Sequence, residues 1–253
     1  MAGHSKWKNI RLHKGKADVE RAKLFGKLSR DLTVAAKAGG GVPESNPRLR
    51  LAIEKARAGS MPADNIKRAI QKGTGELAAD NFVDVTYEGY GPNGVAVMVE
   101  AATDNRNRTV ADVRAIFNKN GGSMGESGSV AWQFNRTGII TIAAAGVDED
   151  ALLEAALEAG ADDMTSEEGE NGEEFSISMS PENLSDVLTA LEGAGFKVSN
   201  SEVQLVPSTT IVLEGDAARK MLKLIDALES YDDVQEVSAN FEISDDVMPQ
   251  LGA

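Results

Sequence analysis

The chain has 253 residues, enough to bury the cores of roughly two or three ordinary domains without disulfide or metal support. It contains no cysteine, which excludes disulfides, thiolate metal sites and cysteine nucleophiles and indicates a reducing compartment. The formal net charge of −14 is unevenly distributed, because residues 1–80 hold 17 Lys and Arg against 8 Asp and Glu. Residues 81–253 hold 9 Lys and Arg against 32 Asp and Glu. A basic N-terminal part therefore precedes an acidic remainder.

The first residues do not have the pattern of a targeting segment. They are charged from the start, contain no run of seven apolar residues, and carry Asp18 and Glu20, which a mitochondrial presequence would avoid. Nowhere does the sequence approach the ~18 consecutive apolar residues of a membrane-spanning helix. We therefore expect a cytoplasmic protein without a membrane partner, whose N-terminal segment belongs to the folded structure.

The period of the apolar residues predicts a long first helix from Ala17 to Lys37, ended by the glycines at 39–41. A stripe of cations, formed by Lys23, Lys27, Arg30 and Lys37, falls on the face opposite the apolar one. The apolar residues expected to face inward are Leu24, Phe25, Leu28, Leu32, Ala35 and Ala36.

Two shorter helices are predicted after the first. Asn46 and Pro47 are typical of a helix cap and first residue, and Gly59 closes that helix. A third helix follows Pro62 and is expected to stop at Gly73. The residues predicted to face inward are Leu49, Ile53, Ala56, Ile66, Ala69 and Ile70. Three helices with short links are typical of a bundle.

The remaining sequence alternates strands and helices. From residue 83 polar and apolar residues alternate up to Glu88, which indicates a strand; a turn, a second strand at 95–99 and a helix at 109–119 follow. Residues 130–206 form a complete unit of strand, helix, strand, helix and strand, and residues 209–243 add strand, helix and strand. This last segment would complete the sheet begun at residue 82 if the middle unit were an insertion.

The predicted fold class is therefore α+β: an N-terminal three-helix bundle followed by two α/β sandwich-like domains, one inserted in the other. The expected boundaries are 1–78 for the basic helical domain and 79–131 plus 207–245 for a discontinuous α/β domain. Residues 132–206 would form the inserted acidic domain.

Two short patterns resemble catalytic motifs but lack the structural context that the chemistry requires. Segment 89–94 (GYGPNG) fits the dinucleotide pattern, yet a strand follows where a helix must hold the pyrophosphate, so a hairpin turn is expected. Segment 121–125 (GGSMG) fits the nucleophile elbow, but the predicted order is helix, serine, strand. With no assembled catalytic constellation, we expect a protein that is not an enzyme and has no small-molecule substrate.

No metal or other cofactor is expected. His4 and His13 are the only histidines, and a basic segment does not supply the carboxylates that would complete a zinc site. Segment 162–174 carries seven carboxylates but lacks the spacing of a calcium loop, so we interpret it as a solvated hairpin loop.

The basic cluster is the strongest functional signal in the sequence. Nine Lys and Arg lie within the first 30 residues, and cations at this density release counterions from a phosphate backbone, which gives salt-sensitive affinity. Trp7, between two lysines, can either stack on an exposed base or pin the segment to the helices. The predicted nucleic-acid-binding residues are Lys6, Trp7, Lys8, Arg11, His13, Lys14, Lys16, Lys23, Lys27, Arg30, Lys67, Arg68 and Lys72.

A second candidate lies in the acidic part of the chain. Arg106 and Arg108 stand just before a predicted helix N-terminus, where they could hold a phosphate. The alternative is a turn and helix cap in which both arginines pair with nearby carboxylates.

Five segments carry a family resemblance: MAGHSKWKNI, the RxxxFxKL pattern around Phe25, MPADNIKRAI, YEGYGPNGVAVMVEAATDNRNRT and NGGSMGESGSVAWQF. Together they resemble the YebC/PmpR family, which includes the mitochondrial translational activators of cytochrome oxidase subunit I. The resemblance implies a helical domain followed by two α/β domains, one inserted in the other. It also implies a cytoplasmic regulator of gene expression with no known catalytic reaction, usually described as a probable DNA-binding transcriptional regulator. The mitochondrial branch acts in translation, and a ribosome-associated role is proposed for bacterial members.

Two modes of nucleic-acid binding follow. In transcription, the second and third helices would form a helix-turn-helix with its turn at 59–61, and Lys67, Arg68, Gln71 and Lys72 would enter the major groove. In translation, the basic N-terminal segment, Trp7 and the stripe of cations on the first helix would bind ribosomal RNA, with the ribosome as partner. Acidic domains that engage a basic protein partner are compatible with either role.

Overall fold

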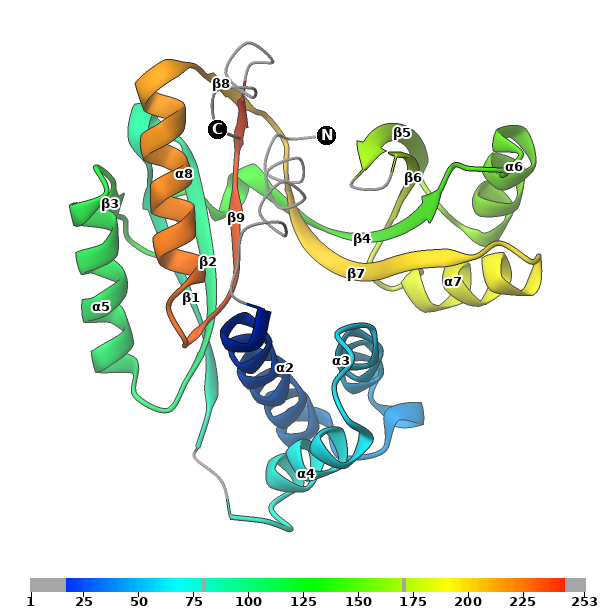
Figure 1. Ribbon diagram of the computed structural model, residues 1–253, viewed down its shortest axis with the longest axis horizontal. Coiled ribbons are helices and arrows are strands. Elements are labelled where there is room, and N and C mark those ends of the chain that lie inside the picture. The colour runs from blue at the N-terminus through cyan, green and yellow to red at the C-terminus, as the bar shows by residue number, and fades with distance from the viewer. Residues whose placement is uncertain (1–16, 79–80, 170–171, 244–253) are drawn as a thin grey trace. The chain divides into compact units, whose positions relative to one another are not determined.

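The computed structural model describes residues 17–78, 81–169 and 172–243 (Figure 1). It confirms the predicted fold class: a three-helix bundle followed by two α/β domains, one inserted in the other. Residues 134–208 form one body, and the other described residues form a second body that contains the bundle and the discontinuous domain.

The bundle consists of α2 (Ala17–Gly39), α3 (Pro47–Ala58) and α4 (Ala63–Thr74). Asn46 caps α3 as predicted: its side-chain oxygen accepts a hydrogen bond of 3.1 Å from the Leu49 amide. Its Nδ2 donates to the carbonyls of Ala35 and Gly40 at 2.9 and 2.8 Å. The cap residue therefore also ties the start of α3 to the end of α2. The buried core of the bundle includes Leu28, Leu32, Ala35, Leu49, Ile53, Ala56, Met61, Ile66 and Ala69.

Two sequence predictions for the bundle were wrong. Leu24 was expected to face inward, but it is 43% exposed. Gly73 was expected to stop the third helix, but α4 continues to Thr74 and ends at Gly75, whose φ of 84° suits a left-handed cap. A Cβ atom at Gly73 would lie 2.4 Å from the Thr33 carbonyl oxygen and 2.7 Å from the Ala36 Cβ. Gly73 therefore allows α4 to approach α2 closely.

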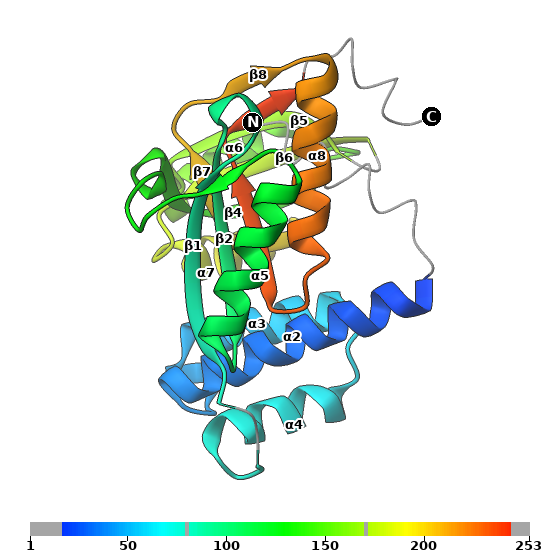
Figure 2. The ribbon, with the colours of Figure 1, turned by 90° about the vertical axis from the view of Figure 1, so that its left-hand side faces the viewer.

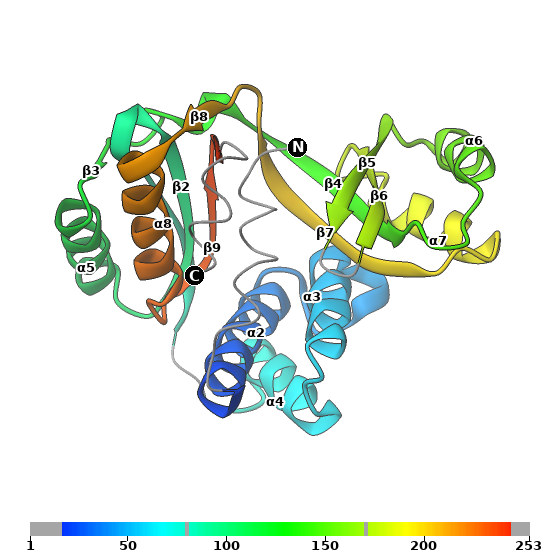
Figure 3. The same cartoon turned by 45° about the horizontal axis from the view of Figure 1, so that its top comes forward.

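The discontinuous domain is an antiparallel sheet with strand order β3-β1-β2-β9. Helices α5 and α8 cover one face of this sheet (Figure 3). Strand β9 pairs with β2 from Val97–Ala239 to Ala101–Val234, so the late segment completes the early sheet, as predicted. Strands β8 and β10, from the same late segment, form a separate two-stranded parallel sheet. The elements are β1 (Val83–Tyr90), β2 (Ala96–Thr103), α5 (Arg106–Lys119), β3 (Ser123–Met124), β8 (Ile211–Leu213), α8 (Gly215–Glu229), β9 (Val234–Ala239) and β10 (Phe241–Ile243).

The segment with the dinucleotide pattern is a turn between two strands, as expected. Pro92–Gly94 forms a single 3-10 turn, η2, between β1 and β2, and Asn93 and Gly94 adopt φ values of 59° and 76°. The Gly91 amide donates to the Val95 carbonyl at 2.8 Å. A strand follows this turn, so no helix N-terminus is available there for a pyrophosphate.

Glu88 departs from the alternation predicted for β1, because Tyr87, Glu88 and Gly89 are all buried. Its carboxylate accepts the amides of Gly128, Val130 and Ala131 at 2.6, 2.8 and 2.8 Å. Burial raises the pKa of Glu88, but these three hydrogen bonds outweigh it, so the pKa lies below its ordinary value. The carboxylate thus fixes the segment that precedes the inserted domain.

The inserted domain is a second antiparallel sheet with strand order β5-β6-β4-β7. Asp148 caps α6, since its side chain accepts from the Ala151 amide at 3.1 Å. The elements are β4 (Phe134–Ala143), α6 (Glu149–Ala159), β5 (Asp163–Gly169), β6 (Gly172–Met179), α7 (Leu184–Gly193) and β7 (Val198–Pro207).

The acidic segment 162–174 was predicted to be a loop, but most of it is paired strand. Asp163 pairs with Ser178 and Glu167 with Glu174, so β5 is the edge strand of the sheet. Exposed carboxylates on an edge strand discourage pairing with another chain, which reconciles the charge with the strand structure.

Replacing Glu88 with Gln should destabilise the protein by about 1–3 kcal/mol at neutral pH, since the amide nitrogen would face a backbone N–H. The folded-state pKa is depressed, so the stabilisation is complete above the ordinary value of 4.5 and is lost as the pH falls through the folded value. Urea denaturation should therefore show the stability difference shrinking at acid pH. Glu126→Gln, exposed on the same segment, is the control and should change stability little. Equal stability of Glu88→Gln and wild type at pH 7 would contradict the structural role.

Alanine substitutions at two helix glycines should have opposite effects on stability. At Gly73 the added Cβ would force α4 away from α2 and cost about 1–3 kcal/mol. At Gly26 no atom lies within 4 Å of an added Cβ, so alanine should stabilise α2 by roughly 0.5–1 kcal/mol. Thermal unfolding of the two variants measures both signs, and a Gly73→Ala protein as stable as Gly26→Ala would rule out the close contact.

Candidate nucleic-acid interface

The predicted site residues fall into groups with different surroundings. Seven of them lie outside the described residues: Lys6, Trp7, Lys8, Arg11, His13, Lys14 and Lys16. The other eight lie on α2, α4 and α5, where their contacts can be compared.

Lys67, Arg68 and Lys72 lie on the exposed side of α4. Ile66 and Ala69 are buried on the opposite side of the same helix, which orients the three cations outward. None of the three forms an ion pair with the residues that the structure describes. Lys23 on α2 is also exposed and, over the same part of the chain, unpaired.

Arg68 and Lys72 line a shallow pocket between α2 and α4, two helices that lie side by side in Figure 2. Phe25 of α2 and Met61, which precedes α4, contribute apolar surface to this pocket. The cations are therefore next to an apolar depression instead of a flat polar surface.

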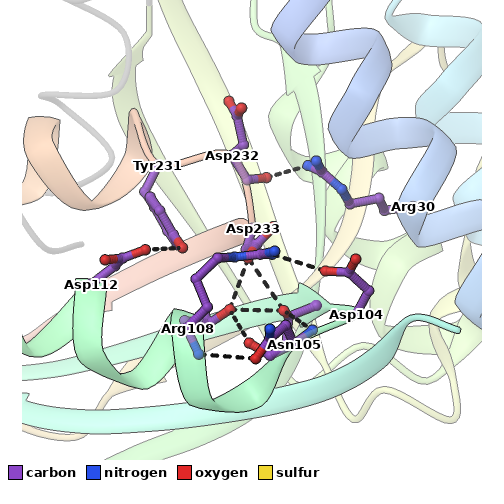
Figure 4. Close-up of polar contacts among 10 residues, drawn as sticks. Arg30, Asp104, Asn105, Arg108, Asp112, Tyr231, Asp232 and Asp233 are labelled. Carbon is purple, nitrogen blue, oxygen red and sulfur yellow. Dashed lines mark hydrogen bonds and ion pairs between the residues drawn. The ribbon is translucent and has the colours of Figure 1, made fainter. Parts of the chain in front are cut away.

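Lys27 and Arg30, although predicted to face nucleic acid, contact the discontinuous domain. Lys27 Nζ donates to the Glu229 carbonyl at the C-terminus of α8, at 2.7 Å. Arg30 donates to the Asp232 carbonyl (Figure 4), and its guanidinium lies 5.6 Å from the centre of the Phe82 ring. A cation at a helix C-terminus is favourable because it complements the helix dipole. These two cations thus bind the bundle to the sheet domain.

Arg106 and Arg108 lie within the first turn of α5 and not before it, since the helix begins at Arg106. Asn105 caps the helix by accepting from the Arg108 amide at 3.1 Å. The Arg108 Nη2 atom lies 2.9 Å from Asp104 and 2.7 Å from Asp233 (Figure 4). Arg106 is exposed and forms no ion pair within the described part of the chain.

The partner of Arg108 is a buried carboxylate, because Asp233 is 5% exposed. Thr109 Oγ1 lies 2.8 Å and Thr103 Oγ1 lies 3.2 Å from its Oδ2 atom. Burial raises the pKa of Asp233, but the hydrogen bonds from Arg108 and Thr109 outweigh it and hold the pKa below its ordinary value. The hydrogen bonds to Asp233 and Asp104 raise the pKa of Arg108, which stays protonated. This cluster joins β2, α5 and the start of β9. Arg108 is therefore paired within the protein, as the alternative interpretation of the two arginines expected.

The sequence did not indicate that Asp233 pairs with Arg108, or that Glu88 accepts hydrogen bonds from the backbone at residues 128–131. Asp233 lies 125 positions from Arg108. No local spacing signals such a pair, and only the return of β9 to β2 brings it together. The polar residues Ser29 and Asn65, which line the pocket between α2 and α4, carried no signal either.

Within residues 17–78, 81–169 and 172–243 there is no group of three His, Asp or Glu side chains that could hold a metal ion. The acidic hairpin of β5 and β6 therefore does not gather its described carboxylates into a cation site. No helix in the described part is long and apolar enough to cross a membrane.

Family models match most of the chain. The N-terminal domain of the TACO1/YebC proteins matches residues 5–76, and the second and third domains of these proteins match residues 82–241. A "Probable transcriptional regulatory protein" of Pelotomaculum thermopropionicum is 53% identical over 247 residues, 97% of this chain and 100% of the relative. A protein of the same description from Geobacter sp. (strain M21) is 51% identical over 251 residues, 99% of this chain and 100% of the relative.

A solved structure is also similar to this chain over most of its length. The crystal structure of a conserved hypothetical protein from Aquifex aeolicus superposes with a TM-score of 0.81 at 47% sequence identity. The match covers 93% of this chain and 96% of the Aquifex chain. The resemblance seen in the sequence is confirmed, and the chain belongs to the TACO1/YebC family, whose relatives include many named as probable transcriptional regulatory proteins.

Proposed function

We propose that this protein is a non-enzymatic regulator of gene expression that binds nucleic acid through its basic helical domain, residues 1–78. The observation that carries the proposal is the row of outward cations on α4, Lys67, Arg68 and Lys72, which have no ion-pair partner in the described residues. Cations left unpaired on a surface are available to phosphates, whose contacts release counterions. The names of the relatives support a role in transcription as the first candidate.

The geometry of α3 and α4 is compatible with DNA binding. The turn between them is short: the Gly59 amide donates to Lys55 and the Met61 amide to Ala56, and Ser60 has a φ of 58°. A short turn of this kind links the two helices of a helix-turn-helix, and the second helix then presents its outer side chains to the major groove. In this proposal Lys67, Arg68 and Lys72 are the contacts from α4.

The acidic domains support the proposal by their charge. Residues 81–253 carry 32 Asp and Glu against 9 Lys and Arg, so they repel a phosphate backbone and confine contact to the helical domain. We include the cations at 6, 8, 11, 14 and 16, with Trp7 and His13, in the proposed surface because they extend the same charge. Lys27, Arg30 and Arg108 already form contacts with other residues of the protein, so we assign them a smaller role in nucleic-acid binding.

Removing two cations from α4 tests the proposal. The double variant Lys67→Ala/Arg68→Ala should bind nucleic acid several-fold more weakly, because two phosphate contacts are lost. The slope of log affinity against log salt should also become shallower by about 0.9 per lost contact. Fluorescence anisotropy with a labelled promoter duplex and with structured ribosomal RNA fragments measures both quantities.

The matched control is Arg136→Ala/Lys197→Ala, which makes the same charge change on exposed residues of the inserted domain. Loss of duplex binding confined to the α4 variant supports a transcriptional role, whereas loss confined to RNA would move the protein to translation. Equal affinity of the α4 variant and the wild type for both ligands would refute the proposed surface.

A further inference from the structure

The pocket between α2 and α4 has a chemical composition that the phosphate contacts alone do not require. Phe25 and Met61 supply apolar surface, Ser29 and Asn65 supply hydrogen-bonding groups, and Arg68 and Lys72 supply positive charge. These are the three kinds of group that recognise, in turn, the face of a base, its polar edge and its phosphate.

Gly26 lies in the interior of α2 and also lines this pocket. Glycine in a helix interior costs stability relative to alanine, by roughly 0.5–1 kcal/mol. At Gly73 a close approach of two helices explains the glycine, but an added Cβ at Gly26 would have no atom within 4 Å. Packing within the described residues therefore does not explain Gly26. Its effect is to leave the pocket open where a side chain would fill it.

The polar groups of the pocket are available to a ligand. Neither the Ser29 hydroxyl nor the Asn65 side chain has a hydrogen-bond partner among the residues described here, and both side chains are partly exposed. Asn65 lies in the first turn of α4, one turn before Arg68 on the same side of the helix. Lys72 follows one further turn along, so the amide and the two cations form a row.

We propose that the pocket between α2 and α4 binds one unpaired nucleotide of a single-stranded segment. The base packs against Phe25 and Met61, Ser29 and Asn65 hydrogen-bond to its edge or to the sugar, and Arg68 and Lys72 contact the phosphate. A duplex keeps its bases stacked and paired, so only an unpaired base can enter. This inference rests on the proposed nucleic-acid function and adds the class of ligand at one place in that surface.

Gly26→Leu tests the pocket without altering any charge. The leucine should fill the open space, and its higher helix propensity should preserve α2. Affinity for an unstructured single strand, RNA or DNA, should fall at least fivefold, in line with the loss of one stacked base. Affinity for a duplex and the salt dependence of binding should stay unchanged, because the cations remain.

Ala38→Leu is the control, since Ala38 is exposed on the same helix and does not line the pocket. Ser29→Leu, one turn from Gly26, is a second blocking variant, and circular dichroism with thermal unfolding checks that all three proteins are folded. A loss confined to RNA or to single-stranded DNA supports the pocket and identifies the source of the nucleotide.

Two results would overturn the inference. One is single-strand affinity of Gly26→Leu and Ser29→Leu equal to that of Ala38→Leu. The other is an equal loss for duplex and single strand. In either case the Lys67→Ala/Arg68→Ala result still tests the proposed function, because that variant removes charge that Gly26→Leu and Ser29→Leu leave in place.

Discussion

The close packing of α4 on α2 determines where the candidate interface lies. Gly73 lets the two helices approach until its α-carbon hydrogens face the Thr33 carbonyl, at a distance that no side chain would allow. With Ile66 and Ala69 buried against the bundle core, the polar side of α4 must face away from it. The position of the exposed cations and the pocket beside them therefore both depend on the packing of α4 on α2. A change at Gly73 would therefore alter the surface as well as the stability.

Internal contacts divide the basic residues into two sets. Lys27 and Arg30 donate to main-chain carbonyls of the discontinuous domain and bind the bundle to it, whereas Arg108 pairs with a carboxylate within that domain. Lys67 and Arg68 have no such partner in the described chain and are exposed. A buried carboxylate such as Asp233 needs a cation close by, whereas a cation on an outer helix face is solvated until a phosphate replaces water. The first set thus serves internal structure, and the second set forms the proposed nucleic-acid surface.

Local sequence pattern was sufficient for much of the fold. The Asn46–Pro47 start of α3, the amphipathic helices and the order of strands are local signals, and the split sheet followed from counting strands. Gly73, Glu88 and Asp233 could not be interpreted in this way, because their roles depend on residues that are distant in sequence. The edge strand β5 was missed because its acidic sequence is typical of a loop, and only its pairing with β6 shows that it is a strand. The pocket could not be predicted either, because its lining residues come together only when α2 and α4 pack side by side.

The most direct test of nucleic-acid contact through the helical domain is ultraviolet crosslinking in living cells. The protein is then digested and the peptides that carry a crosslinked nucleotide are identified by mass spectrometry. The proposed function predicts crosslinked peptides from residues 1–78, with those spanning Phe25 or the start of α4 among them. Crosslinks found only on peptides of residues 134–208, the acidic inserted domain, would contradict it.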